Sequence, residues 1–200
     1  MVSDYQFSAD WFTGNIEHWL ETFRIVGKDF NKPAAILEIG SYEGRSACWI
    51  AENLLNPKDS YLHCIDTFKG SVEHTDLQVD LLTRFTDNIN KTPNAKKIFT
   101  FQGDSKKVLV NKLKEKAKYD FIYVDGSHMS IDVIIDGFLS YHLLEDDGVI
   151  IFDDYGWKHN NVETVKQALN VLEDMLPIRP ILSGWQRSYV KKQRLENLNG

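Results

Sequence analysis

The sequence contains little cysteine, no long apolar run and no excess of positive charge. Its two cysteines, Cys48 and Cys64, fall in segments predicted as helix and strand, without metal-ligand or redox spacing, so we expect both to be buried. No apolar run approaches the roughly 18 residues that span a bilayer, and the first residues lack the features of a signal peptide. Because 29 acidic residues outnumber 23 basic ones, the net charge of -6 disfavours binding to a phosphate backbone. We therefore expect a cytoplasmic protein that binds neither nucleic acid nor a membrane.

The composition is typical of a folded globular domain. Hydrophobic residues make up 42% of the chain and charged residues 26%, and 200 residues fit one domain of ordinary size. The sequence contains no repeats and no linker. It therefore predicts a single domain over residues 1–200, in which a helical cap (1–33) precedes the core (34–192).

Short β-rich runs alternate with longer stretches of helical periodicity, which predicts a parallel sheet built from βαβ units. The predicted strands are Ala35 to Ile39, Tyr61 to Ile65, Ile98 to Gln102, Phe121 to Val124 and Val149 to Phe152. The fourth of these is apolar or aromatic throughout, as expected of a central strand. Apolar residues that recur at helical spacing predict helices in the longer stretches. The positions predicted on the buried helix faces include Leu20, Leu77 and Val162.

Two further segments, Ile178 to Ser183 and Ser188 to Lys192, are too close in sequence for a crossover helix, so they predict an antiparallel hairpin. The predicted fold class is therefore α/β. We expect a Rossmann-like, doubly wound sheet that is mostly parallel, with helices on both faces and an antiparallel hairpin at the carboxyl end.

A glycine-containing turn follows the first predicted strand. The segment reads Glu38-Ile39-Gly40-Ser41-Tyr42-Glu43-Gly44 and leads into an amphipathic helix. In an open parallel sheet, ligands bind beyond the carboxyl ends of the strands, and glycine lets the backbone approach them. Asp66 ends the second strand, where a carboxylate can accept hydrogen bonds from both hydroxyls of a ribose. The alternative is that Gly40 and Gly44 only close a turn and that Asp66 is a solvated strand end.

This turn differs from the dinucleotide-binding fingerprint G-x-G-x-x-G. The glycines are spaced G-x-x-x-G, and Tyr42 stands where the second glycine of the fingerprint admits a pyrophosphate. The interval from Glu38 to Asp66 is 28 residues, whereas the fingerprint places its ribose-binding acid about 20 residues on. The spacing therefore disfavours binding of a nicotinamide dinucleotide.

Three carboxylates follow the fourth and fifth predicted strands, in Val124-Asp125-Gly126-Ser127-His128 and in Phe152-Asp153-Asp154-Tyr155. Carboxylates at neighbouring strand ends repel one another unless a cation lies among them. Oxygen ligands without cysteine favour Mg²⁺, with Mn²⁺ or Ca²⁺ as alternatives. The other interpretations are that the Asp pair caps a turn and that His128 starts a helix and faces solvent.

Over the span from Ala35 to Lys192, the sequence resembles the class I S-adenosylmethionine-dependent methyltransferases. The resemblance implies that the glycine loop holds the methionine part of the cofactor, that the segment after the second strand holds its ribose, and that Gln102-Gly103-Asp104-Ser105 contacts its adenine. An Asp-Ser pair before a helix is equally a good N-cap. The residues implied in cofactor binding are Glu38, Gly40, Ser41, Gly44, Asp66, Thr67, Phe68, Asp104, Ser105 and Asp125.

The acidic strand ends closely resemble the metal-dependent small-molecule O-methyltransferases of the branch that includes macrolide-sugar and aminocoumarin-sugar enzymes. This resemblance implies that Asp125, Asp153 and Asp154 hold the metal ion. It also implies catalytic roles for Asp125 and for His128, which lies three residues further on and can act as the base. Trp11, Phe12 and Trp157 are candidate aromatic platforms for an acceptor, with packing in the core equally compatible.

The expected function is Mg²⁺-dependent methylation of a hydroxyl on a small molecule or sugar. A metal-independent N- or carboxyl-methyltransferase, in which the three Asp residues only shape the pocket, is the nearest alternative. A cofactor-binding subunit without catalysis is a third. The expected partner is the small-molecule or sugar acceptor, and a homodimer would be one way to complete an open pocket.

Overall fold

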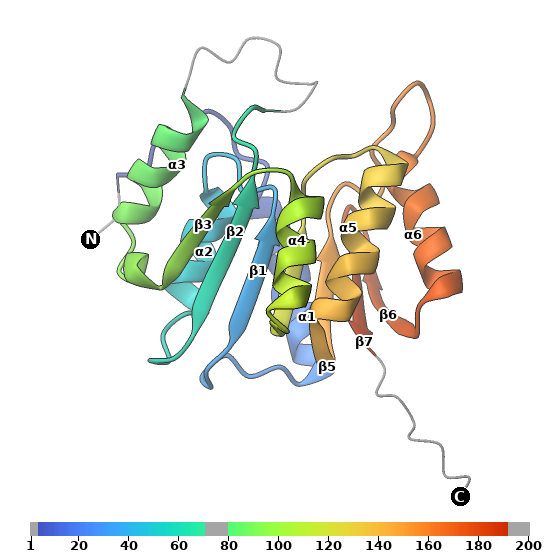
Figure 1. The fold of residues 1–200 in the computed structure, drawn as a ribbon, viewed down its shortest axis with the longest axis horizontal. Helices are drawn as coiled ribbons and strands as arrows, with labels where there is room; N and C mark the ends of the chain where they lie inside the picture. Colours follow the sequence, from blue (N-terminus) through green and yellow to red (C-terminus); the bar gives the residue numbers. More distant parts are fainter. Residues whose placement is uncertain (1–3, 71–79, 192–200) are drawn as a thin grey trace, which may run out of the picture.

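A computed structural model describes residues 4–70 and 80–191 of the chain, which form a seven-stranded sheet covered by helices (Figure 1). The strand order is β3-β2-β1-β4-β5-β7-β6; neighbouring strands from β3 to β5 are parallel, and β7 lies antiparallel between β5 and β6. The strands are β1 (Ala35–Ile39), β2 (Tyr61–Asp66), β3 (Ile98–Gln102), β4 (Tyr119–Val124), β5 (Leu144–Phe152), β6 (Ile178–Ser183) and β7 (Arg187–Lys191). The predicted mostly parallel sheet with a final hairpin is confirmed.

Helices lie on both faces of this sheet, as predicted. The described helices are η1 (Thr13–Asn15), α1 (Ile16–Val26), α2 (Arg45–Asn53), α3 (Leu81–Asn90), η2 (Ala95–Lys97), α4 (Ser105–Lys114), α5 (Ser130–Leu143) and α6 (Thr164–Met175). The helices α4, α5 and α6 cover the face in front in Figure 1, and α1 and α2 lie behind the sheet. Two buried apolar clusters fill the two interfaces, one around Trp19, Ile50 and Phe85 and the other around Leu109 and Leu169.

Strand β4 lies at the centre of the sheet, as its continuous apolar sequence predicted. Successive side chains of a strand point to opposite faces, so both faces of a central strand need apolar residues. Phe121 and Tyr123 belong to the core on the side of α1 and α2, whereas Ile122 and Val124 belong to the core on the other side. The central position of β4 brings its carboxyl end between those of β1 and β5.

The structure differs from the sequence prediction at several element ends. Strand β5 begins at Leu144, five residues earlier than predicted, because Leu144 pairs with Tyr119 of β4. The register is then irregular until Val149 pairs with Phe121, and Asp147 has φ +59°. Lys191 of β7 holds this polar stretch by donating to the Leu144 carbonyl at 2.7 Å and pairing with Asp146 at 3.4 Å. Leu20 is 52% exposed and Val162 precedes α6, so neither lies on the buried helix face predicted for it. The predicted position Leu77 lies outside the described residues.

The segment before α1 crosses the loop between β1 and α2. Ser8 donates from both its backbone nitrogen and its hydroxyl to Oε2 of Glu43, and Arg45 donates to the carbonyl of Ala9. Asp10 forms an ion pair with Arg45 at 3.3 Å. These contacts place Trp11 and Asn15 at the same end of the sheet as the glycine loop. In the described part of the chain, no helix has the length and apolar content needed to cross a membrane.

Candidate functional site

The carboxyl ends of the parallel strands form one row joined by backbone hydrogen bonds. Gly103 donates to the carbonyl of Asp66, Gly40 to Ile65, Asp125 to Ile39 and Asp153 to Val124, at distances of 2.8 to 3.0 Å. The sheet register therefore brings the five predicted segments side by side, although they are far apart in sequence. Ligands of open α/β sheets bind at this edge.

Gly40 and Gly44 are both required by contacts within the protein itself. Gly40 has φ +90°, and a Cβ at this position would overlap the carbonyl oxygen of Asp125. Gly44 has φ +85°, and a Cβ there would lie 2.9 Å from the ring of Phe85. The two glycines thus let the loop after β1 pack closely on its neighbours. This agrees with the interpretation that they close a turn. Contact of this loop with a cofactor remains a prediction.

Asp66 joins this loop to the end of β2. Its Oδ2 accepts a hydrogen bond from the backbone nitrogen of Tyr42 at 2.8 Å, and its Oδ1 accepts one from Phe68 at 2.6 Å. Each carboxylate oxygen has capacity for a further hydrogen bond, and the residue is partly exposed. Asp66 is therefore placed both to shape the loop and to accept from a ribose. Thr67 is exposed, whereas the ring of Phe68 packs against Phe85 in the core.

Glu38 lies beneath the glycine loop and is fully buried. Its carboxylate accepts a hydrogen bond from the hydroxyl of Ser46 on α2, and the Sγ of Cys64 lies 3.5 Å away. Burial raises the pKa of Glu38 to about 6, although hydrogen bonds to its carboxylate oppose this shift. Ser41 and the cysteines are also buried here, as predicted for Cys48 and Cys64. In this structure Glu38 fastens β1 to α2 and is positioned to support the loop.

The segment after β3 caps a helix. Asp104 is the N-cap of α4 and accepts a hydrogen bond from the backbone nitrogen of Lys106 at 3.0 Å, so the capping interpretation is confirmed. The hydroxyl of Ser105 donates to Asp136 on α5 at 2.7 Å. Asp104 is exposed and remains available for a second contact. The predicted adenine contact by Asp104 and Ser105 stays a prediction.

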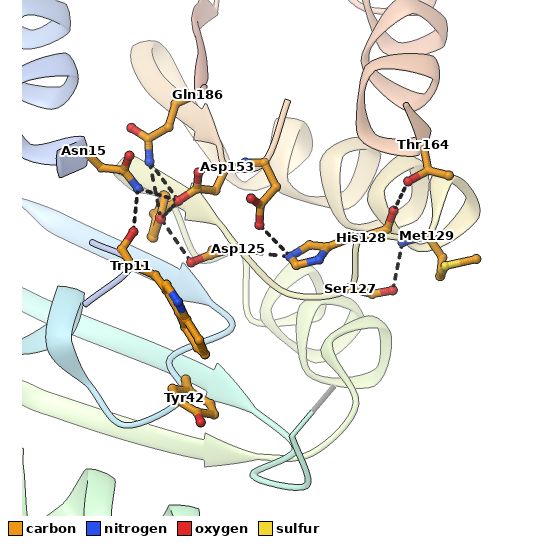
Figure 2. A network of polar contacts seen from close by, with 12 residues as sticks. Trp11, Asn15, Tyr42, Asp125, Ser127, His128, Met129, Asp153, Thr164 and Gln186 are labelled. Atoms are coloured by element: carbon orange, nitrogen blue, oxygen red, sulfur yellow. Dashed lines mark hydrogen bonds and ion pairs between the residues drawn. The ribbon is translucent and has the colours of Figure 1, made fainter. Parts of the chain in front are cut away.

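Asp125, His128 and Asp154 converge beyond the ends of β4 and β5 (Figure 2). One potential ligand atom from each lies within 4.8 Å of the others. The Nε2 of His128 is 2.8 Å from Oδ2 of Asp154 and 4.0 Å from Oδ1 of Asp125. Burial disfavours the charged imidazole, but hydrogen bonds and charge from the two carboxylates outweigh it and raise the pKa of His128 to about 11. We call these three residues the acidic-histidine cluster.

His128 is held firmly in this cluster. Its side chain is only 15% exposed, so the alternative in which it faces solvent is wrong. The carbonyl of His128 accepts a hydrogen bond from the hydroxyl of Thr164 at 2.5 Å, and its ring lies against Trp157 with centroids 4.9 Å apart. These contacts direct Nε2 toward the carboxylates.

Asp153 departs from the prediction that it joins Asp125 and Asp154 in holding a metal. Its side chain is buried, and its Oδ2 accepts hydrogen bonds from Asn15 at 2.8 Å and Gln186 at 3.0 Å and contacts the hydroxyl of Tyr123. The backbone nitrogen of Asp154 donates to its Oδ1 at 2.7 Å. Asp153 and Asp154 point to different sides because they are consecutive residues beyond a strand, and Asp154 has φ +57°.

The candidate aromatic platforms separate into two groups. Phe12 is buried against Trp19, with centroids 5.0 Å apart, so its packing role in the core is confirmed. Trp11 is 62% exposed and lies beside Tyr42 of the glycine loop, and Trp157 lies beside His128. One exposed tryptophan therefore lies beside the glycine loop, and Trp157 lies beside the acidic-histidine cluster.

Three residues of the site were not predicted from the sequence: Asn15, Tyr123 and Gln186. Strand alternation places Tyr123 on the same side of β4 as Asp125, so this neighbour could have been found from the pattern. Asn15 and Gln186 lie 138 and 33 positions from Asp153 in the sequence, and no local motif marks either of them.

A doubly wound sheet with this strand order, an antiparallel β7, a glycine loop after β1 and an acid after β2 defines the class I S-adenosylmethionine-dependent methyltransferases. A family model described as a methyltransferase domain matches residues 37–155. The chain belongs to this family, and it is an S-adenosylmethionine-dependent methyltransferase.

Solved structures share the fold. The O-methyltransferase TomG from Streptomyces achromogenes, in complex with S-adenosylmethionine, is 17% identical with a TM-score of 0.66, over 92% of this chain and 82% of that one. CalS11, a TDP-rhamnose 3'-O-methyltransferase of calicheamicin biosynthesis, is 14% identical with a TM-score of 0.61, over 89% and 80%. MycE from the mycinamycin pathway, in complex with Mg and S-adenosylhomocysteine, is 15% identical with a TM-score of 0.61, over 95% and 53%. A search among curated proteins found no significant match.

Proposed function

We propose that this protein transfers the methyl group of S-adenosylmethionine to a hydroxyl of a small molecule, with a sugar as the first candidate and Mg²⁺ as the bound ion. The acidic-histidine cluster carries this proposal, because two carboxylates and an imidazole meet beside the loop expected to hold the cofactor. The relatives of similar fold support it, since CalS11 acts on a rhamnose and MycE was crystallised with Mg.

The cofactor fits the row of strand ends. The loop from Gly40 to Gly44 would hold the methionine part, and Asp66, which retains acceptor capacity on both oxygens, would hold the ribose. Asp125 adjoins this loop through the hydrogen bond from its backbone nitrogen to Ile39, so it would border the methyl group. Asp104 would face the adenine from the start of α4.

A divalent ion fits the acidic-histidine cluster. Asp125 and Asp154 would hold it through carboxylate oxygens, the donor type that Mg²⁺, Mn²⁺ and Ca²⁺ prefer. Asp154 is 19% exposed and Asp125 31% exposed, so both can meet an ion and solvent, whereas Asp153 is buried behind them. A bound ion would polarise an acceptor hydroxyl and stabilise the oxygen as it loses its proton.

The residues of the chain position the acceptor and remove its proton. Methyl transfer requires the acceptor oxygen, the methyl carbon and the sulfur to lie in line, so orientation supplies much of the rate. His128 would take the proton at Nε2, which faces Asp125 and Asp154 rather than solvent. Trp11, beside the glycine loop, and Trp157, beside His128, would pack against a sugar or another flat acceptor and exclude water.

The direct test is formation of S-adenosylhomocysteine with a panel of acceptors that includes glycosides, catechols, amines and carboxylic acids. We expect turnover with hydroxyl acceptors and a mass increase of one methyl group on oxygen. Methylation of only amines or carboxylic acids would favour the metal-independent alternative. Absence of turnover with every acceptor, in a protein that still binds the cofactor, would favour a subunit without catalysis.

Replacement of Asp66 by Ala is expected to weaken S-adenosylmethionine by about 1.5 to 3 kcal/mol, roughly ten- to a hundredfold, because hydrogen bonds to a charged acceptor would be lost. Calorimetric titration measures this affinity. Because Asp66 also holds Tyr42 and Phe68, the folded state is checked by thermal melting. Asp59→Ala, at an exposed position before β2, is the matched control. Unchanged affinity in a folded Asp66→Ala protein would remove this residue from the cofactor site.

A further inference from the structure

The carboxylate of Asp153 is committed to donors within the protein. Its Oδ2 accepts from Nδ2 of Asn15 at 2.8 Å and from Nε2 of Gln186 at 3.0 Å, and the hydroxyl of Tyr123 contacts the same oxygen. Its Oδ1 accepts from the backbone nitrogen of Asp154 at 2.7 Å. Oδ2 thus faces three donors and Oδ1 one, and the buried side chain lies outside the group of possible ligand atoms that Asp125, His128 and Asp154 form. Asp153 is therefore arranged as a fixed point behind the acidic-histidine cluster.

The two amides that hold Asp153 come from opposite ends of the chain. Asn15 ends η1 and is 8% exposed, and Gln186 lies in the turn between β6 and β7 and is 1% exposed. Both lie outside residues 37–155, which match the family model. A buried amide is costly unless it is hydrogen-bonded, so each amide and the carboxylate fix one another in position. Figure 2 shows both side chains reaching toward Asp153.

Asp153 is connected to the acidic-histidine cluster by two sets of hydrogen bonds. Through Oδ1 it holds the backbone nitrogen of Asp154, whose own carboxylate lies 2.8 Å from Nε2 of His128. Through Oδ2 it contacts the hydroxyl of Tyr123, which lies 3.1 Å from Oδ2 of Asp125. Each carboxylate that faces the predicted ion is thus linked to Asp153 by one intermediate group.

We propose that Asn15 and Gln186 are positioning residues that act through Asp153 to set the geometry in which Asp125 and Asp154 bind a divalent ion. This inference rests on the metal site of the proposed function, and it extends the functional site to both ends of the chain. Partners that orient metal ligands typically change metal affinity by about 10- to 100-fold when they are replaced.

The test is a titration with Mn²⁺ alone, in which electron paramagnetic resonance measures the free ion. The temperature is kept well below the melting transition. Asn15→Leu and Gln186→Leu remove the donors while keeping similar side-chain size. We expect each variant to bind Mn²⁺ about 10- to 100-fold more weakly than the wild type. Affinity for S-adenosylhomocysteine, measured by calorimetry, should stay within about twofold, a range that corresponds to less than 1 kcal/mol.

Thr22→Val is the matched control. The hydroxyls of Thr22 and Ser188 are both fully buried and form a 3.0 Å hydrogen bond that joins α1 to β7 without touching the cluster. This control removes one buried hydrogen bond between the amino-terminal region, which contains Asn15, and the carboxyl-terminal hairpin, which contains Gln186. It should lower the melting temperature and leave the Mn²⁺ affinity unchanged.

Three outcomes would overturn the inference. Wild-type Mn²⁺ affinity in folded Asn15 and Gln186 variants would exclude positioning and leave the metal site intact. An equal loss of affinity in Thr22→Val would assign the effect to general loosening of the structure. Absence of Mn²⁺ binding by the wild type would overturn the metal site and this inference together. If a Leu variant does not fold, Asn15→Ala and Gln186→Ala remove the same donors without added bulk, and the same criteria apply.

Discussion

Replacement of His128 by Gln is expected to lower turnover by about 10²- to 10⁴-fold, the usual cost of losing a general base. Gln keeps a polar side chain beside Asp154 but cannot accept and hold the acceptor's proton as imidazole does. The cofactor would lie against the glycine loop and Asp66 rather than against Nε2 of His128, so its affinity should remain nearly unchanged. Single-turnover kinetics with saturating cofactor measure the chemical step directly.

The control is His142→Gln, at an exposed position in the last turn of α5, the helix that follows His128. It should leave turnover unchanged. The wild-type rate should fall on acidification through one ionisation, as His128 becomes protonated and can no longer accept a proton. This ionisation should disappear in His128→Gln. Near-normal turnover of that variant would assign proton removal to water or to a carboxylate and leave His128 as a structural residue.

Treatment with EDTA is expected to reduce turnover by more than about 100-fold, because polarisation of the acceptor oxygen by a metal contributes several kcal/mol. The charge of the cluster gives a second reason. Without a cation, Asp125 and Asp154 raise the pKa of His128 to about 11, so the imidazole is protonated at neutral pH and cannot act as a base. A divalent ion between the carboxylates offsets their charge. Added Mg²⁺ should therefore restore both the polarisation of the acceptor oxygen and the neutral imidazole of His128 that acts as the base.

Variants of the acidic residues separate the metal from other effects of chelation. Asp154→Asn should need much more Mg²⁺ for the same rate, whereas Asp174→Asn, at an exposed position on α6, should behave as the wild type. S-adenosylhomocysteine should still bind to Asp154→Asn, because this carboxylate follows β5 and lies away from Asp66. Full activity in EDTA would end the metal proposal and favour the metal-independent alternative.

Much of the fold could be predicted because apolar periodicity reports burial. The bounds of β1 and β3 match the predicted runs residue for residue, since both runs are bordered by residues that interrupt the pattern. The start of β5 could not be predicted, because Glu145, Asp146 and Asp147 look like a polar turn. The strand nevertheless begins before them, because Leu144 pairs with Tyr119 of β4 and its carbonyl accepts from Lys191, which comes from a strand more than 40 residues later.

The residues of the candidate site that directly follow a strand could be predicted from the sequence. Those that reach the site from distant parts of the chain could not. Asp125 and His128 follow the same strand three residues apart, and the resemblance to metal-dependent O-methyltransferases assigned both to the site. The pair Asp153 and Asp154 was assigned one role, although alternation beyond a strand sends consecutive side chains in different directions. Asp153, the buried member of the pair, is bonded to Asn15 and Gln186, and sequence spacing contains no information about either contact.

The hydrogen bond between Asn15 and Asp153 joins residues 138 positions apart, and the other amide donor, Gln186, lies in the turn of the final hairpin, between β6 and β7. Contacts so distant in sequence form late in folding, because a long loop must close before they contribute. During synthesis, the first five strands can therefore pair while Asp153 still lacks one of its amide donors. We expect the nascent chain to acquire cofactor-binding strand ends first and a finished metal geometry only after the final hairpin has been added.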